Sequence, residues 1–282
     1  MEANNYEILY RFFRTASEYI EGYRCMEPYP QTYTVRQSIP QKETAPATVL
    51  VQAPEAAYEK NAANADLIHS VSADCTVSAD LASAVPVFNS LQEVYAAVSQ
   101  CRACGLAATR THTVAGEGPE ELSHLTKSVD VMVIGEGPGA DEDRMGRPFV
   151  GRAGQLLDKM LEAIQLSRKT NCYITNVIKC RPPGNRDPAP TECDCCEAFL
   201  HAQIQCIEPH IILVLGRIAA QRLLQTTDGI GKLRGRFFDY HGIPLMPTYH
   251  PSALLRNESL KRPAWEDLKC FRARLLELRA AY

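Results

Sequence analysis

The sequence predicts an α/β fold in which helices cover both faces of a parallel sheet. Short apolar runs recur along the second part of the chain, and a segment with helical periodicity follows each run. This alternation is typical of parallel sheets in α/β proteins. The loops with the most unusual sequences come directly after these apolar runs. Ligands of such sheets bind at the carboxyl ends of the strands. We therefore expect one site built from residues 136–151, 176–190 and 250–256.

The individual strands and helices are predicted from the spacing of apolar residues. Strands are expected where β-branched and apolar residues form short runs, at residues 129–134, 173–179, 211–215 and 245–249. Helices are expected where apolar positions recur with helical spacing, at residues 90–100, 155–165, 191–207, 217–225 and 265–280. The last helix is expected to begin just after Pro263.

The first 87 residues are expected to lie outside the folded domain. Residues 1–25 form a predicted amphipathic helix with an aromatic stripe, which either packs on its own domain or binds a protein partner. Residues 26–87 are rich in Ala, Pro, Ser, Thr, Gln and Glu without a sustained period, a composition typical of a disordered linker. The folded domain is therefore expected to span residues 88–282.

Composition indicates a cytoplasmic protein. The chain has 282 residues, of which 45% are hydrophobic, and a formal net charge of −3. Its N-terminus lacks a basic segment followed by an apolar one, which argues against a secretory signal. No run approaches the roughly 18 apolar residues that a membrane-spanning helix requires, so we expect no membrane association.

Charge is distributed unevenly along the chain. Residues 1–95 contain 6 Lys and Arg against 12 Asp and Glu, whereas residues 96–282 contain 24 against 21. The balance is therefore −6 in the first part and +3 in the second. Because nucleic-acid binding depends on a local basic surface, the acidic total does not exclude it.

The loop after the first strand has the features of a tight ligand-binding turn. Gly135, Gly137 and Gly139 let the backbone approach a ligand closely. The pattern also fits the phosphate-binding turn of dinucleotide-binding domains, which leaves a nucleotide-binding oxidoreductase as one alternative. Residues 141–143 are all acidic, however, and would repel a pyrophosphate. With Phe149 further on, the loop favours a pocket for a flat ring instead.

The cysteines indicate a metal centre. The chain has 11 cysteines and no export signal, which favours reduced thiols over disulfides. Cys101 and Cys104 form a C-x-x-C pair, and Cys180 ends the second predicted strand. The fourth position is open among three residues of the next helix, Cys193, Cys195 and Cys196. Four thiolates suit a 4Fe–4S cluster or a tetrahedral zinc ion.

Three motifs carry a resemblance to a known family. They read GEGPGADEDRMGRPFVGRAGQLL, TNVIKCRPPGNRDPAPTEC and YHPSALLR, in this order. Over residues 90–282 the chain resembles the family 4 uracil-DNA glycosylases, the iron–sulfur branch of the uracil-DNA glycosylase superfamily. The resemblance implies a three-layer α/β/α sandwich with a four-stranded parallel sheet. It also implies a 4Fe–4S cluster held by Cys101, Cys104, Cys180 and Cys196.

The resemblance also assigns roles in reading the base. Such an enzyme flips the uracil nucleotide out of the stack and reads its Watson–Crick edge. Phe149 is expected to stack on the base, and the Asn176 amide to pair with N3–H and O4 of uracil. Glu142 is expected to occupy the space that a Tyr fills in the best-known branch of the superfamily, where it would exclude the 5-methyl group of thymine.

Two further residues are expected to act on the glycosidic bond. His250 would donate a hydrogen bond to uracil O2 as negative charge develops there. Gly137 stands where the best-known branch places a water-activating Asp, so the usual base is missing. Glu136 would then orient the water or stabilise the cationic sugar, and the division of labour between it and His250 is left open.

Contacts with the DNA are expected from an apolar wedge and several basic residues. Leu254, with Leu255 as its rival, would enter the gap left by the flipped base, and Arg256 would contact phosphate. Phosphate contacts are also expected from a glycine-bounded loop with Lys232, Arg234 and Arg236. Three further basic residues flank the cluster cysteines: Lys179, Arg181 and Arg186. The cluster would hold their loop in place against the DNA.

The expected function is excision of uracil from single- or double-stranded DNA by a monomeric enzyme, which leaves an abasic site. An Fe–S module that binds nucleic acid without cleaving the glycosidic bond is the alternative from another class. Activity on a uracil-containing oligonucleotide separates the two.

Overall fold

The structure is a computed structural model and describes residues 88–119 and 129–281. The predicted N-terminal helix and the linker lie outside these residues. The described residues form a sheet with the strand order β2-β1-β3-β5-β4. The strands are β1 Val131–Gly135, β2 Cys172–Asn176, β3 Ile211–Leu215, β4 Phe238–Tyr240 and β5 Ile243–Thr248. The predicted α/β class is confirmed, because β1 pairs in parallel with β2 and β3, and β3 pairs in parallel with β5.

The fifth strand corrects the expectation of a four-stranded sheet. β4 runs antiparallel to β5 at one edge of the sheet. His241 and Gly242 connect the two strands with φ values of 52° and 88°, as in a two-residue type I′ hairpin turn. A strand of three residues is too short to show an alternating pattern, so the segment around Phe238 gave no signal of its own.

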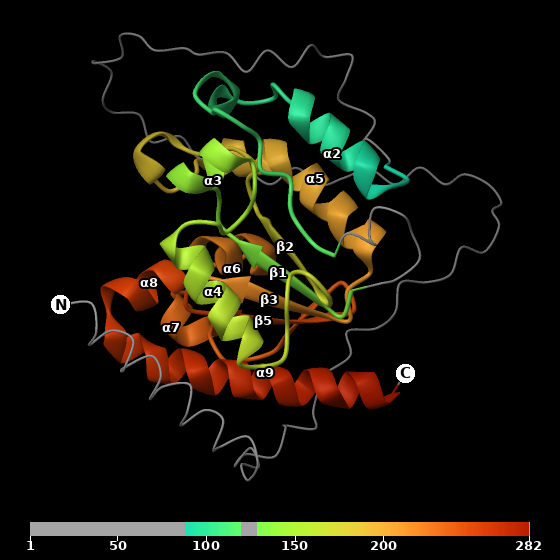
Figure 1. Ribbon diagram of the computed structural model, residues 1–282, viewed down its shortest axis with the longest axis vertical. Helices are drawn as coiled ribbons and strands as arrows, with labels where there is room; N and C mark the ends of the chain where they lie inside the picture. The colour runs from blue at the N-terminus through green and yellow to red at the C-terminus, as the bar shows by residue number, and fades with distance from the viewer. Residues whose placement is uncertain (1–87, 120–128, 282) are drawn as a thin grey trace, which may run out of the picture. The chain divides into compact units, whose positions relative to one another are not determined.

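Helices cover both faces of the sheet and produce the expected three layers (Figure 1). The helices on one face are α2 Leu91–Gln100, α5 Pro190–Ile207 and α6 Arg217–Leu224. Those on the other face are α4 Arg152–Glu162, α8 Pro251–Arg256 and α9 Lys261–Ala281. Successive strand residues point to opposite faces. Val133 accordingly packs in the layer of α4 and α9, and Ile134 packs in the layer of α5 and α6.

Shorter helical segments lie in the connections. They are α3 Ala140–Met145, α7 Ile230–Leu233 and the 3₁₀ turns Gly105–Ala108, Pro183–Asn185 and Glu258–Leu260. In the parts of the chain that the structure describes, no helix combines the length and apolar character needed to cross a membrane.

Two helices begin earlier than the sequence predicts. α9 begins at Lys261 and includes Pro263 in its first turn. Proline is tolerated there because the first backbone N–H groups of a helix have no intrahelical partner. α4 begins at Arg152, directly after Gly151, and not at the predicted Gln155.

A segment outside the named strands covers the free edge of β2. The Glu117 N–H donates to the Ile174 carbonyl at 2.9 Å, and the Ile174 N–H donates to the Glu117 carbonyl at 2.7 Å. This antiparallel bridge fixes Glu117 beside the edge strand.

The parallel strands end together at one edge of the sheet. Glu136 follows β1, Asn176 is the last residue of β2, Gly216 follows β3, and His250 comes shortly after β5. The three unusual loops therefore converge as the sequence predicts, at the position where α/β sheets bind their ligands.

Candidate active site

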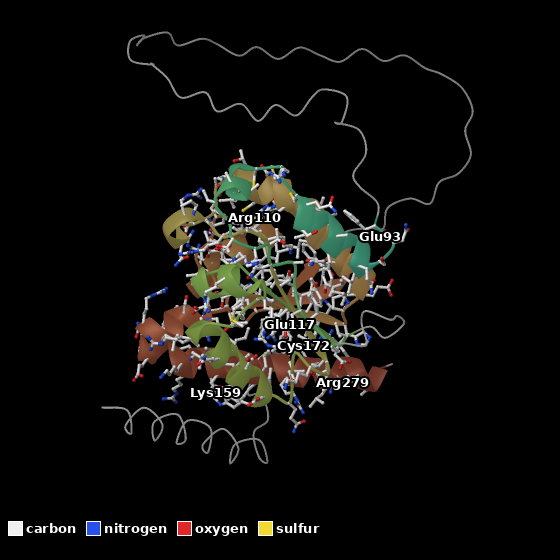
Figure 2. The ribbon with its side chains drawn as sticks, turned by 45° about the horizontal axis from the view of Figure 1, so that its top comes forward. Glu93, Arg110, Glu117, Lys159, Cys172 and Arg279 are labelled. Carbon is white, nitrogen blue, oxygen red and sulfur yellow. The ribbon has the colours of Figure 1, made fainter. Side chains whose placement is uncertain are left out.

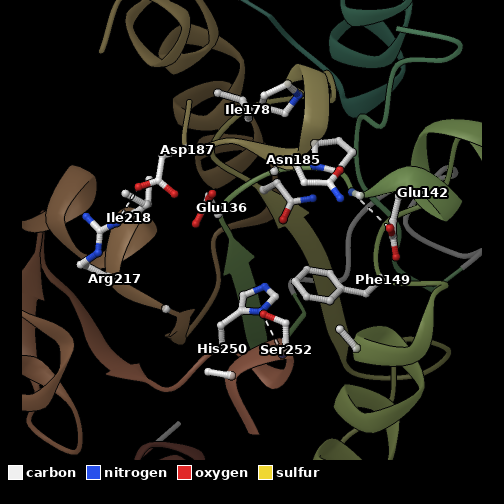
Figure 3. Close-up of a pocket in the computed structure, with 18 of the residues that line it drawn as sticks. Glu136, Glu142, Phe149, Ile178, Asn185, Asp187, Arg217, Ile218, His250 and Ser252 are labelled. Carbon is white, nitrogen blue, oxygen red and sulfur yellow. Dashed lines mark hydrogen bonds and ion pairs between the residues drawn. The ribbon is translucent and has the colours of Figure 1, made fainter. Parts of the chain in front are cut away.

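A pocket of about 480 Å³ lies at the carboxyl ends of the parallel strands. Figure 3 shows that Glu136, Phe149 and His250 face one another around it. Other predicted site residues that line the pocket are Gly137, Glu142, Asn176 and Arg256. The fold thus brings together residues that are up to 120 positions apart in the sequence, from Glu136 to Arg256.

Phe149 forms a flat apolar wall of this pocket. Its side chain is buried, and its ring centroid lies 5.6 Å from that of His250 at an interplanar angle of 31°. The ring also lies against the backbone of Gly135, where a Cβ atom would be 2.5 Å from Cζ of Phe149. Any side chain at Gly135 would therefore push the ring away, so the glycine that ends β1 leaves room for the ring of Phe149.

Asn176 places an unsatisfied amide in the pocket. The residue is 1% exposed, and its Oδ1 has no hydrogen-bond partner among the described residues. A buried acceptor without a donor costs about 1–3 kcal/mol, so such an atom at a pocket wall indicates that a ligand supplies the donor. The backbone carbonyl of Asn176 is held separately by Lys179, whose Nζ donates to it at 2.6 Å.

His250 is set up as a neutral hydrogen-bond donor. It is the N-cap of α8, and its Nδ1 accepts the Ser252 N–H at 3.1 Å. With Nδ1 acting as the acceptor, the proton of the neutral ring lies on Nε2. Burial, together with a smaller effect of the nearby Arg256 cation, lowers the pKa of His250 to about 4. The ring is therefore uncharged near neutral pH and retains one N–H donor.

Glu136 lies in a small cluster of charges at the other side of the pocket (Figure 3). Burial raises the pKa of Glu136, the Asp187 carboxylate raises it further, and Arg217 opposes the shift. Asp187 and Arg217 form an ion pair of 2.6 Å. Neither was among the predicted site residues. Asp187 belongs to one of the three converging loops, so that convergence could have indicated it, whereas Arg217 gave no signal in the sequence.

Glu142 is occupied by the backbone of its own loop. One carboxylate oxygen accepts the N–H groups of Val150 and Gly151, both at 2.9 Å, and the other accepts that of Gly139 at 3.1 Å. The side chain lines the pocket and also ties its glycine-rich turn to the start of α4. The acidic run after the first strand is therefore partly structural.

The leucine expected to enter the DNA is not at the surface. Leu254 is 2% exposed and packs in the core beneath the sheet with the helices α4 and α9. Leu255, its neighbour on α8, is 41% exposed. Helix α8 therefore turns the side chain of Leu254 into the core and that of its rival Leu255 outward.

Four cysteines from three separate segments lie near one another. Burial raises the pKa of Cys180, and the charges of Cys101 and Cys104 raise it as well. Burial likewise raises the pKa of Cys196 to about 12, with contributions from the charges of Cys180 and Cys104. Arg110, which is labelled in Figure 2, joins two of these segments. Its Nη1 donates to Cys180 Sγ at 3.1 Å, and its Nη2 donates to the Cys101 carbonyl at 2.6 Å. The Arg110 guanidinium beside Cys180 suits a centre in which this sulfur is an anionic thiolate.

Two of the competing cysteines differ in their contacts. Cys195 donates to the Ala103 carbonyl at 3.4 Å, whereas the charges of Cys180 and Cys104 act on the pKa of Cys196. Among residues 88–119 and 129–281, no three His, Cys, Asp or Glu side chains converge as ligands of a single ion. Four Cys thiolates are a donor set for either a 4Fe–4S cluster or a tetrahedral zinc ion.

Four of the basic residues expected to contact DNA have partners within the protein. Arg234 donates to both carboxylate oxygens of Asp267, at 3.0 and 2.6 Å, and Lys179 is fully buried. Arg186 forms a bidentate pair with Glu192 at 2.8 and 2.6 Å. The glycine-bounded loop also contains α7, where Lys232 pairs with Asp228 at 3.0 Å. Arg234 and Lys179 are therefore structural residues.

A parallel α/β sheet that ends in a buried aromatic ring, an unsatisfied amide and a neutral histidine is suited to binding a flat heterocyclic base. A family model described as the uracil DNA glycosylase superfamily matches residues 122–269. The chain belongs to this superfamily, which confirms the family expected from its motifs.

Its relatives include type-4 uracil-DNA glycosylases. The enzyme of Thermotoga maritima is 44% identical over 176 residues, which are 61% of this chain and 88% of the relative. That of Archaeoglobus fulgidus is 38% identical over 188 residues, 64% of this chain and 90% of the relative. That of Saccharolobus solfataricus is 39% identical over 180 residues, 61% of this chain and 80% of the relative.

Proposed function

We propose that the chain excises uracil from DNA by hydrolysing the N-glycosidic bond of a flipped deoxyuridine, which leaves an abasic site. The observation that carries this proposal is the buried, unpaired Oδ1 of Asn176 in the pocket beside Phe149. Uracil N3–H would satisfy this oxygen, and the amide N–H groups would donate to uracil O4. Cytosine presents the opposite pattern at both positions, so a fixed amide would reject it.

Departure of the base is helped by His250. Cleavage of the glycosidic bond leaves a uracil anion, and the Nε2–H of the neutral ring would donate to its O2. A donor of this kind, aimed at the atom where charge develops, is typically worth about 3 kcal/mol. The bond that Nδ1 accepts from Ser252 fixes both the tautomer and the ring orientation.

Attack of water on the sugar is assigned to Glu136. Its carboxylate would orient the water against C1′ and balance the positive charge that develops on the sugar as uracil leaves. The proton that the water loses would pass to this carboxylate, whose pKa is raised by burial and by Asp187. A raised pKa makes the carboxylate a better proton acceptor.

Leu255 is proposed as the side chain that fills the gap in the stack. It is the exposed leucine of α8, whose first residues line the pocket, and Arg256 follows it at the pocket wall. Arg256 would hold a phosphate beside the flipped nucleotide. Unstacking a base costs a few kcal/mol, and an apolar side chain in the vacated space offsets part of this free energy.

Cys101, Cys104, Cys180 and Cys196 are proposed to hold a 4Fe–4S cluster. When bound, the cluster would cross-link three segments of the chain, which stabilises the loop between Cys180 and α5 at the pocket wall. We further propose that residues 88–282 are the catalytic domain of a cytoplasmic, monomeric enzyme, and that residues 1–25 form the helix available to a protein partner.

The function is tested with an oligonucleotide that carries one uracil. Incubation with the purified chain, followed by alkali, should break the strand at the uracil and leave an otherwise identical thymine strand intact. Single- and double-stranded forms are assayed side by side. Binding of the uracil strand without a break would contradict the proposal and favour an Fe–S module that only binds nucleic acid.

A further inference from the structure

Arg168 is a buried cation that the proposed chemistry does not use. It lies in the connection between α4 and β2 and is 8% exposed. Its Nη1 donates to the Pro148 carbonyl at 2.8 Å, and its Nη2 donates to the Phe149 carbonyl at 2.9 Å. One guanidinium therefore holds two consecutive carbonyls of the loop that carries the aromatic wall of the pocket.

The backbone that Arg168 holds is in an unfavourable conformation. Phe149 has φ +52°, in the left-handed region that bulky residues rarely adopt. Such a conformation is strained and persists only where the surroundings fix it. A Cβ atom on Gly154 would lie 1.9 Å from the Phe149 carbonyl oxygen, so α4 also packs directly against this peptide. The strained peptide is thus in contact with both Gly154 and Arg168.

Two carboxylates fix the guanidinium itself. Asp158 Oδ1 accepts from Nε at 2.9 Å and from Nη2 at 2.7 Å, while Glu117 Oε2 accepts from Nη1 at 3.4 Å. Glu117 is in turn fixed beside β2 by its bridge to Ile174, near the centre of the domain in Figure 2. All three nitrogens of the Arg168 side chain are therefore directed by the sheet edge and by α4.

We propose that Arg168 is a positioning residue for base stacking: it holds the Phe149 peptide in its left-handed conformation so that the ring faces the flipped base. This inference rests on the proposed uracil excision. Lysine at this position could not replace arginine fully, because its single ammonium lacks the planar fork that donates to two carbonyls and a carboxylate together. Loss of the guanidinium would let the peptide relax and turn the ring away from the base.

The chain offers a matched control in Arg147. Its Nη2 donates to Glu117 Oε1 at 2.7 Å and its Nε to Oε2 at 3.2 Å, so it shares a carboxylate with Arg168. Its side chain is 55% exposed. Arg147→Met therefore removes a cation from Glu117 and keeps the hydrogen bonds to Pro148 and Phe149.

A double-mutant cycle tests the inference with single-turnover cleavage of a uracil oligonucleotide by the full, iron-loaded chain. Arg168→Met should slow cleavage roughly tenfold or more, since small displacements of positioning groups have effects of this size. In a Phe149→Ala background the same change should slow it less than about twofold, because residues that act as a unit are not additive. Arg168→Lys should fall between Met and wild type, and Arg147→Met should cleave like wild type.

Additive penalties from Arg168→Met and Phe149→Ala would overturn the inference, since a purely structural arginine would slow cleavage regardless of the ring. Iron content and thermal unfolding are measured on each variant. If Arg168→Met does not fold, Arg168→Lys carries the same cycle. If the wild-type chain cleaves and the penalties of the two substitutions are additive, this inference alone is overturned. If the wild-type chain releases no uracil, the proposed function is overturned and the inference with it.

Discussion

At the scale of single residues, the pocket combines groups whose protonation is determined by burial. His250 is kept neutral, with a pKa of about 4, while burial raises the pKa of Glu136. The neutral ring can donate a hydrogen bond to the uracil anion as its charge develops. The carboxylate with a raised pKa can accept a proton from water. The two shifts thus support the two proposed roles, leaving-group stabilisation and water activation.

Replacement of His250 should give the larger catalytic loss. His250→Ala removes a donor worth about 3 kcal/mol, or about a hundredfold in the rate of single-turnover cleavage. Glu136→Gln keeps the shape and removes the charge, and its loss is expected to be smaller. DNA binding should change little in either variant, because phosphate contacts supply most of the affinity. His201→Ala on α5 is the control, and normal cleavage by the His250 variant would refute its role.

His250 should also leave a signature in the stability of the protein. Folding lowers the pKa of His250 from about 6.5 to about 4, so the unfolded chain binds a proton in this window that the folded chain does not. The contribution of His250 to the free energy of unfolding is therefore complete above about pH 6.5 and is lost as the pH falls toward 4. His250→Asn keeps the N-cap acceptor of α8 and removes this titration. The free energy of unfolding, measured with urea, should fall less steeply between pH 7 and 4.5 for the variant than for the wild type. Equal slopes would contradict the assignment.

At the scale of helices and strands, the spacing of apolar residues located the four parallel strands and the helices between them. The pattern could not locate β4, which has three residues, or choose between Leu254 and Leu255. That choice depends on how α8 is rotated against the core, where it contacts α4 and the 3₁₀ turn Glu258–Leu260. Arg168 could not be predicted for the same reason, because it acts through hydrogen bonds to carbonyls and carboxylates of three other segments.

The rotation of α8 predicts opposite phenotypes for its two leucines. Leu255→Ala should leave stability unchanged and slow cleavage of double-stranded uracil DNA roughly tenfold, because the flipped state loses its wedge. Single-stranded DNA has no stack to restore, so its cleavage should change much less. Leu254→Ala should instead lower the free energy of unfolding by about 2–5 kcal/mol. The assignment of Leu255 as the wedge is wrong if Leu254→Ala is stable and only that variant loses activity on duplex DNA.

At the scale of the whole molecule, the cysteine centre and the pocket take residues from the same stretch of the chain. Cys180 follows shortly after Asn176, and the pocket residues Asp187 and Arg186 lie between Cys180 and α5. The motifs predicted these cysteines, the strand ends and most of the pocket, because each depends on local sequence. The ion pairs that bind Arg234 and Arg186 within the protein could not be predicted, since both partners are set by the tertiary fold.

The cluster prediction is tested by metal content. Anaerobically purified protein should be brown and contain about four irons per chain, as expected for four Cys ligands. Cys180→Ser should lose most of the iron and lower the thermal stability, whereas Cys206→Ser, on a part of α5 away from the proposed ligands, should keep both. Stoichiometric zinc without iron in the wild-type protein would contradict the prediction.

The central claim is that the unpaired amide of Asn176 reads uracil, and release of the free base tests it most directly. Wild-type protein and Asn176→Asp are incubated under single turnover with oligonucleotides that carry uracil or cytosine at one position, and the released base is quantified. Asp replaces the amide donors by acceptors, so uracil O4 would face a carboxylate. We expect uracil release to fall by about a hundredfold or more, consistent with the loss of buried hydrogen bonds, and cytosine release to gain relative to uracil. Asn89→Asp, at an exposed position beside α2, should behave like wild type. Unchanged uracil release by Asn176→Asp would remove this residue from the pocket's chemistry and contradict the account.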